Sequence, residues 1–78
     1  MSQRNKLIWQ LSGMDAHKIA EHHMVHLMEY MQSNDLVVLD KGIELISEFS
    51  AISYVIVDRT FVENIRINLK PHKVEVLD

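Results

Sequence analysis

Apolar side chains that recur with the period of an α-helix constrain the fold of this chain most. At 100° per residue, most apolar residues between positions 16 and 33 fall on one contiguous stripe, and charged or polar residues lie opposite together with Val25. The stripe comprises Ala16, Ile19, Ala20, Met24, Leu27, Tyr30 and Met31. The pattern predicts an amphipathic helix from Ala16 to Ser33, roughly 27 Å long at 1.5 Å per residue. Asp15 is the candidate N-cap, and Asn34-Asp35 ends the helix.

Segments with the composition or alternation of strands lie on both sides of this helix. Residues 6–11 alternate in polarity before the Ser12-Gly13 break, which predicts a first strand. Residues 51–57 are apolar on both faces and rich in β-branched side chains, as is typical of a central strand.

The C-terminal part of the chain has the sharpest alternation. Residues 64–70 place Ile65, Ile67 and Leu69 on one face, which predicts a strand after a turn at residues 58–60. Pro71 interrupts this pattern, and residues 73–77 predict a final strand with Val74 and Val76 turned inward.

Residues 36–49 have two interpretations. The first is a hairpin in which residues 36–39 form a strand, Asp40-Lys41-Gly42 form a type I turn with a Gly bulge, and Gly42 takes a positive φ. Residues 43–49 would then be the return strand, although Ile46 breaks its alternation. The second interpretation makes residues 43–49 a short helix capped by Asp40. The hairpin fits the composition better.

One strand, one long helix and several short strands predict an α+β fold in a single domain spanning residues 1–78. We expect a two-layer sandwich, in which the long amphipathic helix packs on a small antiparallel sheet. A helix followed by five antiparallel strands also resembles the element order of the Sm-like small barrels. That resemblance lies in element order alone and implies, as the alternative, a small barrel with an N-terminal helix that would assemble into RNA-binding oligomers.

The amount of apolar side chain is large for so small a domain. The chain has 78 residues, of which 47% are hydrophobic, with two Gly and one Pro. A small domain has a high surface-to-volume ratio, so we expect part of this apolar surface to contact another subunit or partner. The candidate interface residues are Trp9, Met28, Val55 and Val57. The two valines lie on the face of the central strand away from Tyr54, where a second subunit would cover them.

Composition argues against several classes of protein. The chain has no cysteine, so disulfides and thiolate metal sites are excluded. Its longest apolar run is four residues, far short of a membrane span, and no signal-peptide pattern is present. We therefore expect a cytoplasmic protein. Eight basic residues are scattered and the net charge is −3, which makes nucleic-acid binding an unfavoured function.

Histidines are concentrated in the predicted helix, where "EHHMVH" holds three of the five in the chain. His22 and His26 are spaced i, i+4, and Glu29 lies near His22 in angle, so the three could form half of a Zn²⁺, Ni²⁺ or Cu²⁺ site. The more ordinary interpretation is that both imidazoles are solvated surface residues. His23 falls inside the apolar stripe, where we expect a packed, neutral imidazole bonded to a carbonyl or to a hydroxyl such as that of Tyr30 or Tyr54.

No catalytic signature is present. The sequence has no Gly-rich phosphate loop, no nucleophile elbow and no HExxH pattern, so an enzyme is not expected. The leading hypothesis is a small non-enzymatic regulatory or adaptor protein, a homo-oligomer that acts through protein–protein contacts and holds no cofactor. The alternative hypothesis is a metal- or small-ligand-binding module that uses His22, His26 and Glu29 with Zn²⁺ or Ni²⁺.

Overall fold

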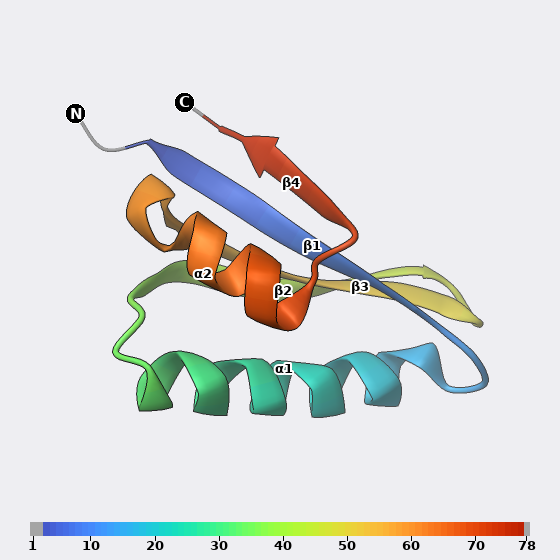
Figure 1. Cartoon of the computed structure of the whole chain (residues 1–78). Coiled ribbons are helices and arrows are strands. Elements are labelled where there is room, and N and C mark those ends of the chain that lie inside the picture. Colours follow the sequence, from blue (N-terminus) through green and yellow to red (C-terminus); the bar gives the residue numbers. More distant parts are fainter. Residues whose placement is uncertain (1–2, 78) are drawn as a thin grey trace.

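The computed structural model describes residues 3–77 and contains four strands and two helices within them (Figure 1). The strands form one antiparallel sheet with the order β2-β3-β1-β4. In chain order the elements are β1 (Arg4–Ser12), α1 (Ala16–Ser33), β2 (Val38–Ser47), β3 (Ser50–Asp58), α2 (Arg59–Leu69) and β4 (Lys73–Val76).

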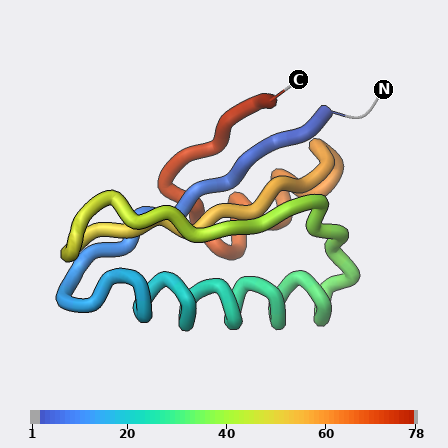
Figure 2. Tube along the Cα trace, turned by 180° about the vertical axis from the view of Figure 1, so that it is seen from behind, coloured from blue at the N-terminus to red at the C-terminus, as the bar shows by residue number. Residues whose placement is uncertain are grey.

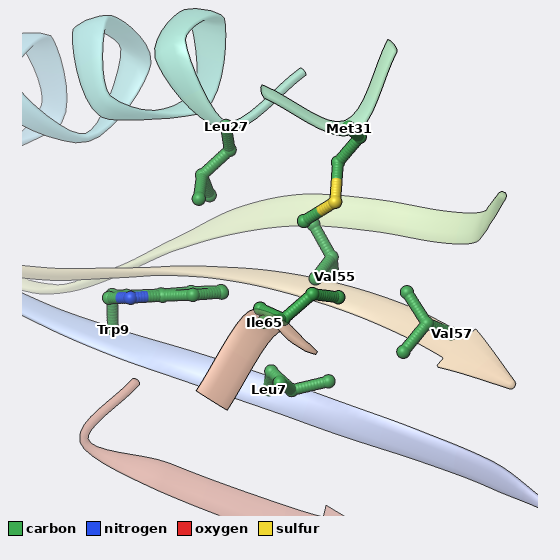
Figure 3. Close-up of a cluster of buried hydrophobic side chains, with 7 residues drawn as sticks. All are labelled: Leu7, Trp9, Leu27, Met31, Val55, Val57 and Ile65. Carbon is green, nitrogen blue, oxygen red and sulfur yellow. The ribbon is translucent and has the colours of Figure 1, made fainter. Parts of the chain in front are cut away.

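Both helices pack on the same face of the sheet and share one apolar core with it. Side chains from β1, β3, α1 and α2 meet in this core, which is drawn in Figure 3. Seen from behind, the strands lie in front of α2, so the opposite face of the sheet carries no helix (Figure 2). The buried members of the core are Leu7, Trp9, Leu27, Met31, Val55, Val57 and Ile65.

The fold class expected from the sequence is confirmed, because a long amphipathic helix packs on a small antiparallel sheet. The alternative of an Sm-like barrel is wrong. The sheet is open, with β2 and β4 at its two edges, and a second helix replaces one of the strands that the barrel needs. Neither helix of the described chain combines the length and the apolar character needed to cross a membrane.

The predicted bounds of α1 are confirmed, and backbone geometry explains its C-terminal end. Asp35 adopts the left-handed conformation, with φ 55°. Its N–H donates to the carbonyl of Gln32, and the N–H of Leu36 donates to that of Met31 at 2.8 Å. These paired bonds are a Schellman motif, which satisfies the last carbonyls of a helix. At the other end, Asp15 occupies the N-cap position but makes no side-chain cap bond.

Residues 59–69 form helix α2, so the strand predicted for residues 64–70 is wrong. The Asp58 carboxylate accepts a hydrogen bond from the N–H of Thr60 at 2.9 Å, which makes Asp58 an N-cap rather than a turn residue. Ile65 is fully buried, whereas Ile67 is 58% exposed, which is inconsistent with two inward positions of one strand. The helix covers an end of the sheet face that α1 leaves open.

The hairpin predicted between residues 36–39 and 43–49 is wrong, because residues 38–47 form one continuous strand, β2, which pairs with β3. Residues 43–47 continue β2 rather than forming the alternative helix, and the chain reverses at Glu48-Phe49. Gly42 lies inside β2, opposite Tyr54, and has no positive φ. A methyl group built on Gly42 would overlap the Tyr54 phenol, with Cζ only 2.6 Å away. Gly42 therefore leaves room for the Tyr54 ring rather than forming a turn.

The central strand β3 pairs with a neighbour on each side, as predicted. Its Val55 and Val57 have no exposed surface, because α1 and α2 cover them from within the chain. The expectation that a second subunit covers these two valines is therefore wrong. It arose because residues 59–69 were not predicted to form a helix that covers the sheet from within the chain. On the helix-free face, Ile52, Tyr54 and Ile56 remain half-buried.

Candidate functional site

The histidine pair expected on the helix surface is present. His22 and His26 are both exposed, and their Nε2 atoms lie 3.0 Å apart, with the rings nearly perpendicular. Glu29 contacts the opposite nitrogen of His26, with Oε1 3.4 Å from Nδ1. The structure thus brings the three predicted residues together but gives Glu29 a different place. Glu29 lies behind the His26 ring rather than beside the two Nε2 atoms.

A closed metal site is not built from these residues alone. Among residues 3–77, no group of three His, Asp or Glu side chains is arranged to hold a metal ion. His17, the next histidine on α1, pairs with Glu21 at 2.8 Å. His72 lies beyond α2, where its Nδ1 accepts a hydrogen bond from the backbone N–H of Gln10. Any ion at the histidine pair would therefore keep several of its coordination positions open.

His23 packs against the core, as the sequence predicted, but its partner is a different hydroxyl. Its Nδ1 and the Oγ of Ser53 are hydrogen-bonded at 2.7 Å, and its ring lies 5.5 Å from that of Trp9. Burial lowers the pKa of His23 below its usual value, and the neighbouring His26 and His72 lower this pKa further. The imidazole is therefore held neutral near pH 7.

The Ser53–His23 pair does not form an accessible nucleophile. Ser53 lies at the centre of β3 and has no exposed surface, so a substrate could not reach its Oγ. A nucleophile and its base need access to a reacting atom about 3 Å away. The hydroxyl instead satisfies an imidazole that is half removed from water. This arrangement is a packing contact between α1 and the sheet.

The predicted interface residue Trp9 belongs to the core. Trp9 is 3% exposed, and its Nε1–H donates to the carbonyl of Leu69 at 2.9 Å, which fastens the end of α2 to β1. Met28 is half-buried against the same core. The indole is thus an internal anchor rather than part of a free surface.

Several exposed apolar side chains gather at one end of the molecule. The turn between β1 and α1 lies beside the β2–β3 hairpin in both views (Figures 1 and 2). A hydrogen bond from the N–H of Gly13 to the carbonyl of Phe49, 2.9 Å long, joins the two loops. We call the exposed apolar residues at this end the hairpin-tip patch. It consists of Met14, Leu45, Ile46 and Phe49, each more than half exposed.

A shallow hollow of about 350 Å³ lies within this region, between the start of α1 and the end of β2. Leu45 and Ile46 line it together with polar residues that include Asp15, His17 and Glu48. Protein-binding surfaces commonly combine apolar and polar side chains in this way. Grouped exposed apolar side chains indicate an interaction surface, whereas single exposed ones are common on any protein.

The sequence pattern does not predict this patch, because the patch depends on an irregularity in β2. Ile46 has no partner in the β2–β3 register, since Leu45 pairs with Ala51 and Ser47 pairs with Ser50. The irregularity is a β-bulge, which inserts one extra residue and turns it away from the regular alternation. The break in alternation at Ile46 was the visible signal. Nothing marked Phe49 as a turn residue.

Comparison of the chain with protein-family models, curated proteins and solved structures finds no significant match in any of the three.

Proposed function

We propose that the protein is a small non-enzymatic interaction module that associates with a second copy of itself through the hairpin-tip patch. The observation that carries the proposal is the grouping of exposed apolar side chains at one end of the molecule, where two of them, Leu45 and Ile46, line a hollow. Phe49 occupies a turn, its side chain is 58% exposed, and its ring is not part of the hydrophobic core. Aromatic anchors of this kind contribute strongly to protein–protein contacts.

A second copy is the proposed occupant because the chain is small and rich in apolar residues. Besides the patch, apolar side chains such as Val25, Ile67 and Val76 are exposed elsewhere on the described surface. At the hairpin tip, the exposed side chains of Leu45 and Ile46 line a hollow. In a two-fold dimer the same patch of both copies is buried, so each patch residue contributes to the interface twice. The dimer would act as a regulatory or adaptor unit.

The size of the effect can be estimated from exposure. Burying a large apolar side chain contributes about 1.5–3 kcal/mol, so the exposed halves of Ile46 and Phe49 contribute roughly 1 kcal/mol each. In a symmetric dimer the two residues together would contribute about 4 kcal/mol, and every 1.4 kcal/mol changes an association constant about tenfold. Replacing both should weaken association by more than a hundredfold.

Sedimentation velocity over a concentration series tests the proposal. The wild-type chain is expected to dimerise at tens of micromolar, and the double variant Ile46→Thr/Phe49→Ser is expected to remain monomeric. Val25→Ser is the matched control, because Val25 is equally exposed but lies on the outer face of α1. A wild-type chain that stays monomeric throughout, or a double variant that dimerises as strongly as the wild type, would reject the proposal.

A further inference from the structure

The exposed histidine pair on α1 is held together by a direct contact between its two rings. Two imidazoles approach within 3.0 Å at their Nε2 atoms, on the solvent side of the helix. In this arrangement one ring can donate a single hydrogen bond to the other, while both remain open to solvent. The same two nitrogens are the atoms with which histidine most often binds metals.

The spacing of the nitrogens fits one ion held by both rings. Imidazole nitrogens lie about 2.0–2.1 Å from a bound divalent metal, so two nitrogens 3.0 Å apart would subtend about 94° at the ion. Adjacent ligands of an octahedral or square-planar ion subtend about 90°. A tetrahedral ion would need the nitrogens about 3.3 Å apart. The pair is therefore closer to the ligand angle that Ni²⁺ and Cu²⁺ prefer.

Glu29 provides a second observation that points to a ligand site. Its carboxylate lies 3.4 Å from Nδ1 of His26, on the side of the ring away from His22. A carboxylate near Nδ1 favours a proton on that nitrogen, and Nε2 is then free to bind a metal; carboxylates commonly support metal-binding histidines in this way. Glu29 is thus a positioning residue, while the histidines are the ligands.

We propose that His22 and His26 chelate one divalent transition-metal ion through their Nε2 atoms, with Glu29 orienting His26. Two ligands come from the chain, and the remaining coordination positions hold water, since residues 3–77 supply no third ligand. Such a site is exchangeable and exposed. It lies on the outer face of α1, apart from the hairpin-tip patch, so it goes beyond the proposed function and can fail or succeed independently of it.

The test is titration of the untagged full chain with NiCl₂, followed by isothermal calorimetry and by thermal unfolding. The wild type is expected to bind one Ni²⁺ per chain and to melt at a higher temperature with the ion, because a ligand of the native state stabilises it. His22→Ala/His26→Ala is expected to lose both effects. His17→Ala is the matched control, since His17 is an exposed histidine of the same helix with its own carboxylate partner.

Two further variants separate ligand from positioning roles. Glu29→Gln should keep the one-to-one stoichiometry but bind Ni²⁺ about tenfold more weakly, at the lower end of the effects seen for such supporting carboxylates. His26→Ala alone should weaken binding more than Glu29→Gln does. Equal Ni²⁺ binding by the wild type and by His22→Ala/His26→Ala, or no binding by the wild type at millimolar Ni²⁺, would overturn the proposal.

Discussion

Replacement of two isoleucines in α2 tests whether residues 59–69 form a helix or a strand. Ile65 has no exposed surface and lies in the core with Leu7 and Val55, whereas Ile67 is mostly exposed. Ile65→Ala removes buried carbon worth about 0.8 kcal/mol per methylene and leaves a cavity, so we expect a loss of about 3 kcal/mol in the free energy of unfolding. Ile67→Ala should change it by less than about 0.5 kcal/mol, since the side chain is largely in water and alanine favours the helix.

Urea unfolding, followed by far-UV circular dichroism and by the fluorescence of the single tryptophan Trp9, measures both changes. If Ile65→Ala fails to fold, Ile65→Val provides the same comparison at a cost of about 1 kcal/mol. A strand would place Ile65 and Ile67 on one face, so similar losses for both alanine variants would refute the helix and the core built on it.

Three further predictions concern contacts within the fold. Trp9→Phe should cost about 1–3 kcal/mol, measured by circular dichroism, because the Leu69 carbonyl loses its donor. Gly42→Ala should cost about 1–3 kcal/mol by overlap with the Tyr54 ring, and a double-mutant cycle with Tyr54→Leu should recover most of that cost. Burial lowers the folded-state pKa of His23 below its unfolded value of 6.5, so unfolding takes up a proton between these two values. The contribution of neutral His23 to the stability of the fold is therefore complete above pH 6.5 and falls as the pH drops towards the folded-state pKa. Urea midpoints should consequently depend less on pH in His23→Gln than in the wild type.

The sequence predicted the long helix and the central strand because their patterns are unambiguous. It failed at residues 64–70, where two periods coexist. Ile65, Ile67 and Leu69 alternate as in a strand, but Phe61, Ile65 and Leu69 are also spaced by four, as on one face of a helix. Local pattern cannot choose between these periods. The need to cover the remaining sheet face favours the helix, and this need becomes visible only in three dimensions.

The two surface features differ in how far they could be predicted. The proximity of His22 and His26 depends only on the regularity of one helix, so the i, i+4 spacing was sufficient. The hairpin-tip patch depends on the register of β2, which a bulge at Ile46 shifts, and on a turn at Glu48-Phe49 that lacks Gly, Asn or Pro. The shifted register of β2 does not follow from the alternation of its residues, and the position of the turn does not follow from its composition.

The most direct test of the proposed self-association is a concentration series of amide nitrogen–proton NMR spectra. If two copies meet at the hairpin-tip patch, the cross-peaks that move with concentration belong to residues 13–17 and 45–50. The helix-free face of the sheet, with Ile52, Tyr54 and Ile56, is the competing surface. Concentration-dependent shifts confined to that face, or no shifts at all up to hundreds of micromolar, would contradict the account.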